Sequence, residues 1–148
     1  MRIVFDTNVL VLARAHQLAQ GPARRGLLFV ATGSDVLILS QYLLQELRRI
    51  LAYPRVLKSS GLTALDISEY LDYLASVSTL VHPLPVPENV LRDPADEPVL
   101  GTALAGKADV ICTRDADFFT EEVRRFSAAR GIQILSDLEL LRALRLQS

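Results

Sequence analysis

The sequence predicts a three-layer α/β/α sandwich with a mostly parallel sheet of about five strands. Three observations predict this fold class: short apolar segments alternate with longer helical patterns, the short segments lack the polar alternation of half-exposed strands, and capping residues mark several helix starts. The 148 residues, half of them apolar, are enough to bury one full core. We therefore expect a single domain over residues 1–148.

Five short apolar segments are expected to form the sheet. An internal parallel strand is covered on both faces, so its sequence is a continuous apolar run and not an alternating one. Each segment is bounded by polar or turn-forming residues, as strand ends usually are. The five segments are Arg2–Phe5, Val36–Leu39, Thr79–His82, Asp109–Cys112 and Ile132–Leu135.

Helical patterns occupy the stretches between these strands. Ser136 and Glu139 form a capping-box pattern, and Thr63 and Thr120 stand at two other helix starts. Two helices are expected after the first strand and two after the second, with one after each later strand. The expected helices are Asn8–Ala19, Ala23–Ala31, Gln41–Ala52, Ala64–Ser76, Pro98–Gly106, Glu121–Arg130 and Leu138–Leu146.

The composition excludes several classes of function. A net charge of −1 gives no overall basic field for nucleic acid. Cys112 is the single cysteine and lies in an apolar run, so we expect a buried thiol, no internal disulfide and a reducing, cytoplasmic environment. There is no cluster of Cys and His residues for zinc and no run of 18 apolar residues for a membrane span.

Acidic residues follow the strands at one edge of the predicted sheet. Asp6 ends the first strand, Glu46 lies on the helix after the second, and Asp115 and Asp117 follow the fourth. A further acidic segment, residues 93–97, precedes the helix of the third connection. Ligands of open parallel sheets bind at the carboxyl ends of the strands, where strand order reverses. We therefore expect these carboxylates to converge there.

Converging carboxylates repel one another unless a cation lies between them. Ligand sets made of oxygen alone favour Mg²⁺ or Mn²⁺, and such a centre is suited to phosphodiester hydrolysis. Each acid also has an ordinary structural interpretation. Asp93 before Pro94 reads as a helix N-cap, Glu46 could pair with Arg49, and the acids after the fourth strand could be turn residues.

The ordered acidic motifs resemble those of PIN-domain ribonucleases, most closely the VapC-like toxin components of toxin–antitoxin systems. The matching segments span almost the whole chain and occur in the family's order. They are Asp6-Thr7-Asn8, the helix with Ser40 and Glu46, the segment from Asp96 to Ala103, the segment from Ala108 to Asp115, and the strand-like segment from Gly131 to Leu135 before the last helix.

The resemblance implies a role for each of these residues. The ligands of Mg²⁺ or Mn²⁺, and hence the catalytic residues, would be Asp6, Glu46, Asp96 and Asp115. Asn8 and Thr113 would orient water or the ligands, Asp93 and Asp117 are alternative ligands, and Arg114 could contact the RNA phosphate. Many relatives carry glycine at the position of Arg114, so the loop here is bulkier.

The function implied is endonucleolytic cleavage of single-stranded RNA by metal-activated water. The resemblance also implies an antitoxin partner that masks the acidic crevice, and a homodimer. Four tyrosines are candidates for an interface, although packing in the core or in a groove is the more usual role: Tyr42, Tyr53, Tyr70 and Tyr73. The alternative is a catalytically silent PIN-like scaffold that binds RNA or a partner. A phosphatase with Asp6 as nucleophile fits poorly, because Asn8 stands where a second acid is needed.

Overall fold

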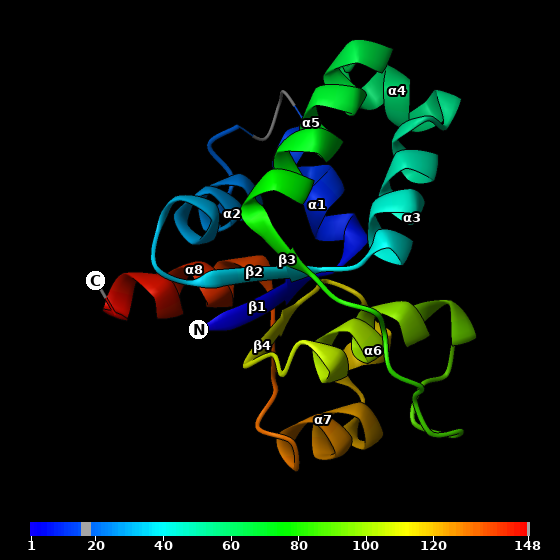
Figure 1. Cartoon of the computed structure of the whole chain (residues 1–148), viewed down its shortest axis with the longest axis vertical. Helices are drawn as coiled ribbons and strands as arrows, with labels where there is room; N and C mark the ends of the chain where they lie inside the picture. Colours follow the sequence, from blue (N-terminus) through cyan, green and yellow to red (C-terminus); the bar gives the residue numbers. More distant parts are fainter. Residues whose placement is uncertain (16–18, 148) are drawn as a thin grey trace.

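The computed structural model describes residues 1–15 and 19–147. Its centre is a parallel sheet of five strands in the order β3-β2-β1-β4-β5 (Figure 1). Every neighbouring pair is parallel, which confirms the predicted sheet. The strands are β1 (Arg2–Phe5), β2 (Val36–Leu39), β3 (Ser78–Leu80), β4 (Val110–Cys112) and β5 (Gln133–Leu135).

Helices cover both faces of the sheet. In Figure 1, α1, α3 and α5 lie above the sheet and α6 and α7 below it, while α8 packs against α2. This is the predicted three-layer sandwich. Its helices are α1 (Thr7–Arg14), α2 (Pro22–Thr32), α3 (Gln41–Leu51), α4 (Pro54–Ser60), α5 (Ala64–Val77), α6 (Glu97–Ala105), α7 (Glu121–Ala128) and α8 (Asp137–Gln147), with short 3₁₀ turns η2 (Pro94–Asp96) and η3 (Ala116–Phe119).

Two strands have the predicted bounds and three differ at their ends. β3 begins at Ser78 and ends at Leu80, two residues before the predicted end. The next amide, Val81 N–H, still donates to Leu39 O at 2.9 Å, but the chain then enters the proline-rich loop and pairing stops. β4 begins after Asp109, because the Asp109 carboxylate accepts the Arg2 backbone N–H at 2.7 Å and closes the strand end.

The helix predictions were wrong in two places. Three helices follow β2, not two, because Pro54 starts the short helix α4 at a position where proline is well tolerated. Gly61, with φ of 72°, ends α4 in the left-handed conformation. The helix expected over residues 8–19 ends at Arg14, and residues 16–18 of that prediction lie outside the described part of the chain.

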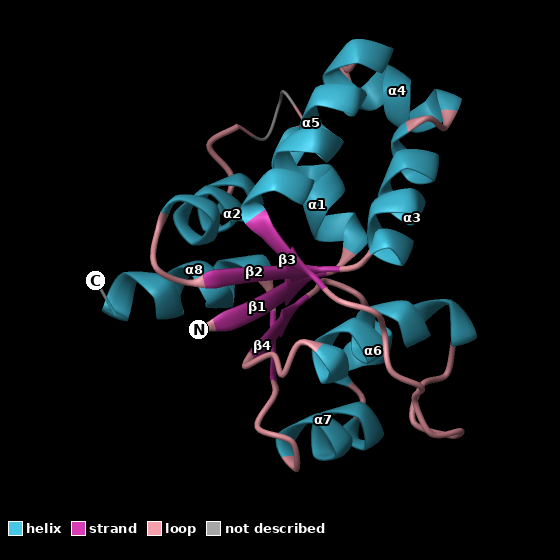
Figure 2. Ribbon diagram, in the orientation of Figure 1, coloured by secondary structure: helices cyan, strands magenta, loops and turns pink. Residues whose placement is uncertain are grey.

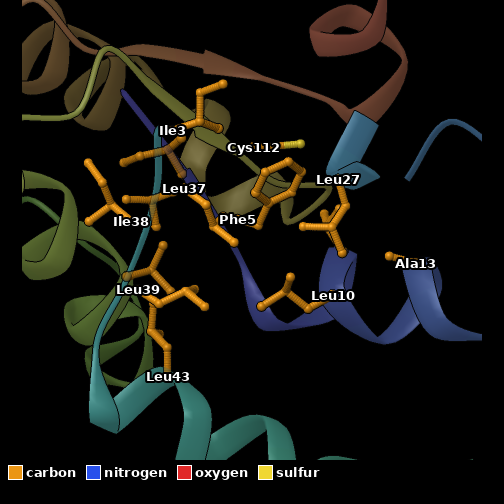
Figure 3. Close-up of a cluster of buried hydrophobic side chains, with 14 of the residues drawn as sticks. Ile3, Phe5, Leu10, Ala13, Leu27, Leu37, Ile38, Leu39, Leu43 and Cys112 are labelled. Atoms are coloured by element: carbon orange, nitrogen blue, oxygen red, sulfur yellow. The ribbon is translucent and has the colours of Figure 1, made fainter. Parts of the chain in front are cut away.

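The core lies on both sides of the central strands. In Figure 3, Phe5 of β1 and Cys112 of β4 lie beside one another, with Leu10 of α1 and Leu27 of α2 on the same side. Phe5 and Cys112 are fully buried, as predicted for the cysteine, and burial raises the pKa of its thiol. Among the described helices, none is both long and apolar enough to cross a membrane.

Strand order places one crevice at the carboxyl end of the sheet. β1 has β2 on one side and β4 on the other, so the connections leaving β1 and β4 diverge there. The Asp6 backbone N–H donates to Cys112 O at 2.9 Å and extends the β1–β4 pairing by one residue. The residues directly after β1 and β4 are therefore held side by side, as the sequence predicted.

Candidate metal centre

Asp6 is a buried carboxylate with two hydroxyl donors. It is 4% exposed and lies between the end of β1 and the start of α1. Thr113 Oγ1 donates to Asp6 Oδ2 at 2.8 Å, and Thr7 Oγ1 approaches Oδ1 at 3.3 Å. These bonds stabilise a charge that burial alone would disfavour.

Thr113 connects two acids. Its fully buried hydroxyl donates to Asp6 and accepts the Asp115 backbone N–H at 3.0 Å. Asp115 Oδ1 in turn accepts the Asp117 backbone N–H at 3.0 Å, which closes the first turn of η3. The orienting role predicted for Thr113 therefore has a structural basis in these bonds, and the turn role of Asp115 coexists with its place at the site.

Asp115 also belongs to a group of three carboxylates that converge from two loops. Asp96, Asp115 and Asp117 each offer an oxygen that lies within 4.8 Å of the others, and all three side chains are partly buried. Both candidates for the fourth acid, Asp115 and Asp117, thus lie in the cluster. The distance is short enough for one cation to bind all three.

Asp96 is positioned by a capped turn. Asp93 accepts the Ala95 N–H at 2.9 Å and caps η2, as the Asp-Pro sequence predicted, and α6 begins directly after Asp96. Among the described residues, Asp96 Oδ2 is buried without a hydrogen-bond partner. A buried carboxylate oxygen without a partner is costly, so this atom points to a ligand.

Glu46 lies on α3, close enough to Asp6 for the two charges to interact. Its side chain is 26% exposed and lies 3.8 Å from the Arg49 guanidinium, the pairing considered from the sequence. The helix that carries it is fixed by Ser40, whose hydroxyl caps α3 and accepts a 3.0 Å hydrogen bond from Thr102 of α6. Sequence reasoning missed Thr102, because a lone threonine in an apolar helix gives no signal of its partner.

The carboxylates perturb one another. Burial is the main cause that raises the pKa of Asp96, to about 7, with the charges of Asp115 and Asp6 adding to it. Burial first and the Asp6 charge second raise the pKa of Glu46. Burial also raises the pKa of Asp6, while the Thr113 hydrogen bond opposes that effect. Asp6, Glu46, Asp96 and Asp115 therefore belong to one electrostatic unit.

The residues present fit a hard divalent cation. The donor set consists of carboxylate oxygens, one of which is buried without a partner among the described residues. Asn8 is exposed in the first turn of α1, two residues after Asp6, between the buried residues Thr7 and Val9. Of the predicted acids, Asp96 and Asp115 lie within the 4.8 Å cluster together with Asp117. Asp6 and Glu46 lie outside that group, and they are linked to it through the effect of the Asp6 charge on Asp96 and on Glu46.

Arg114 is bound to a neighbouring helix. Its guanidinium donates to both carboxylate oxygens of the buried Asp137, at 2.9 and 2.7 Å, and joins the loop after β4 to the start of α8. The side chain remains 51% exposed, so other N–H groups of the guanidinium stay accessible. This ion pair fixes the bulky Arg114 side chain in the loop after β4 by anchoring it to α8.

We expect Asp137→Ala to lower the free energy of unfolding by about 1–2 kcal/mol, because it removes a bidentate charge-assisted pair whose arginine is half exposed. Glu121→Ala is the matched control: its carboxylate also pairs with an arginine, Arg125, but both are exposed, and we expect a change below about 0.5 kcal/mol. Urea unfolding measures both. Equal losses in the two variants would contradict the structural role of Asp137.

Comparison with known proteins identifies the family. A family model described as PIN domain matches residues 2–117, which include all the acids of the cluster. The chain belongs to the PIN domain family. PIN domains are typically nucleases and generally use divalent metal ions, in agreement with the acidic cluster. No curated protein matches the chain significantly.

Proposed function

We propose that this PIN domain is a metal-dependent endoribonuclease that cleaves single-stranded RNA. The observation that carries the proposal is the buried, unpartnered oxygen of Asp96 inside a cluster of acids at the switch point of the sheet. Asp6, Glu46, Asp96 and Asp115 would hold Mg²⁺ or Mn²⁺, with Asp93 and Asp117 as alternative ligands. A bound cation of this kind lowers the pKa of water and neutralises charge that develops on the phosphate.

The protein's own residues orient this chemistry. Thr113 holds the Asp6 carboxylate and the Asp115 backbone in fixed positions, so the ligands need little rearrangement. Asn8, exposed two residues after Asp6, would position water or RNA through its amide. Arg114 offers its free N–H groups to an RNA phosphate while Asp137 holds the rest of the guanidinium.

Cleavage of a labelled single-stranded RNA tests the proposal. With millimolar Mn²⁺ or Mg²⁺ we expect internal cuts that leave a 5′-phosphate and a 3′-hydroxyl, and we expect a chelator to stop them. Cleavage that continues in the chelator would contradict a metal-dependent mechanism. RNA binding without any cleavage would instead support the silent scaffold.

We further propose that the protein is the toxin of a toxin–antitoxin pair, that it acts in the cytoplasm as a homodimer, and that an antitoxin masks its crevice. The support is the sequence resemblance to VapC-like toxins. Of the four tyrosines considered for an interface, Tyr42 and Tyr53 are exposed. Tyr70 is buried and donates its hydroxyl to Leu10 O at 2.7 Å, in agreement with the alternative of core packing.

A further inference from the structure

A second hollow lies beside the acidic cluster. Its volume is about 320 Å³, near the lower end of the range of about 300–1,000 Å³ that is usual for ligand pockets. One wall is Tyr42 of α3, another is the proline-rich loop after β3, and the floor includes the start of α6. The residues that line it include Tyr42, His82, Leu84, Pro94, Glu97 and Pro98.

The pocket and the metal centre share two structural elements. Pro94 and Pro98 line the pocket, and Asp96 lies between them in the chain. On α3, Tyr42 precedes Glu46 by four residues, which places both side chains on the same face of the helix. The pocket therefore adjoins the positions of Asp96 and Glu46 along both elements.

The pocket presents an accessible aromatic ring. Tyr42 is 52% exposed although it follows a buried helix cap. Its ring meets the His82 ring edge-on, with centroids 5.8 Å apart and planes inclined by 69°. Such a contact orients the tyrosine ring but leaves ring surface exposed, because an edge-on neighbour does not stack face to face on it.

The wall opposite Tyr42 is fixed to α6. Leu84 N–H donates to Gly101 O at 3.0 Å, and a Cβ on Gly101 would lie only 2.4 Å from Leu84 O, so glycine permits the contact. Figure 2 shows the loop after β3 passing along α6 before it turns away. Prolines on both sides restrict the backbone further. The pocket is thus largely preformed.

We propose that this pocket binds one unpaired nucleobase of the RNA, next to the phosphate held at the metal centre. The inference rests on the proposed function. Unpaired bases stack on exposed aromatic rings, and a base in a duplex has no free face to offer. Glu97 is exposed at the pocket and can accept an N–H from the exocyclic amino group of a base.

Tyr42→Ala tests the pocket by binding, independently of cleavage. We measure fluorescence anisotropy of a short labelled single-stranded RNA in a chelator, and expect Tyr42→Ala to weaken binding roughly 5- to 100-fold, while Tyr42→Phe retains it. Tyr53→Ala is the matched control, because Tyr53 is 46% exposed and lies outside the pocket. Equal binding by wild type, Tyr42→Ala and Tyr53→Ala would overturn the proposal.

Two further arms separate base stacking from other effects. Annealing the RNA to its complement should remove the difference between wild type and Tyr42→Ala, and a difference that persists on the duplex would contradict the pocket. In a series of RNAs with one abasic nucleotide each, one position should weaken binding to wild type but not to Tyr42→Ala. If every abasic position weakened RNA binding equally in wild type and Tyr42→Ala, the result would contradict base binding in the pocket.

The same variants distinguish this pocket from the nuclease proposal. If Tyr42→Ala weakens RNA binding and wild type cleaves no RNA with any metal, the base-binding pocket is supported and the nuclease proposal is contradicted. If wild type cleaves RNA in Mn²⁺ and Tyr42→Ala has an unchanged KM, the nuclease activity stands and the pocket does not.

Discussion

Replacing Asp6 or Asp96 with asparagine is expected to reduce metal-dependent RNA cleavage about 1,000-fold or more. Each substitution keeps the shape of the side chain and removes one negative charge from the cluster. Loss of metal-assisted charge stabilisation costs several kcal/mol in the barrier, and each 1.36 kcal/mol is a factor of ten in rate. Rates of cleavage of one labelled RNA in Mn²⁺ measure the effect.

The control for this experiment is Asp72→Asn, which makes the same chemical change at an exposed site on α5. We expect its rate to stay within about twofold of wild type, as for an exposed substitution away from the site. Asp6→Asn or Asp96→Asn with wild-type cleavage would disprove the assignment of these residues. The cleavage rate of Thr113→Val should lie between that of the Asp72→Asn control and those of the Asp6→Asn and Asp96→Asn variants. We expect a loss of about 10–100-fold, because the substitution removes the hydroxyl that orients Asp6.

Asp96→Asn is expected to stabilise the metal-free protein at pH 8 by about 1–2 kcal/mol, after allowance for solvent screening. The pKa of Asp96 is raised from 3.8 to about 7, chiefly by burial, so folding favours its neutral form. Its contribution to stability is present below about pH 4 and is lost as the pH rises through about 7. Asparagine stays neutral and avoids this loss.

Bound metal should make the wild-type protein more stable than Asp96→Asn, which reverses the order expected without metal. Mn²⁺ at about 100 times its dissociation constant stabilises a folded protein by about 2.7 kcal/mol, and a variant without the site gains nothing. Thermal unfolding at pH 4 and pH 8, in chelator and in Mn²⁺, measures both effects with Asp72→Asn as the control. A metal-free Asp96→Asn variant that is less stable than wild type at pH 8 would contradict the electrostatic account.

The sequence predicted the parts of this protein that local patterns determine. A short apolar run that ends in Asp6 predicted both β1 and the edge at which the carboxylate lies. Asp93 before Pro94 predicted the cap that positions Asp96, and Ser136 with Glu139 predicted the capping box at α8, which both of its hydrogen bonds confirm. These features depend on residues within a few positions of one another.

The sequence did not predict what depends on distant partners. The Ser40–Thr102 hydrogen bond joins residues 62 positions apart, and the Arg114–Asp137 pair joins residues 23 apart. Tyr70 and Tyr42 occur in similar helical contexts, yet Tyr70 is buried against α1 and Tyr42 lines a pocket. The difference depends on which other element packs against each helix face. A periodic apolar pattern predicts that a face is buried, but it does not predict which element buries it.

The most direct test of the metal centre is a crystal structure of the protein soaked in Mn²⁺, with anomalous scattering to locate the ion. We predict an anomalous peak within coordination distance, about 2.0–2.4 Å, of Asp96 Oδ2 and of an oxygen of Asp6 or Asp115. A peak there would assign the unpartnered oxygen to the metal. Full Mn²⁺ occupancy elsewhere on the protein, with these carboxylates contacting water alone, would contradict the account.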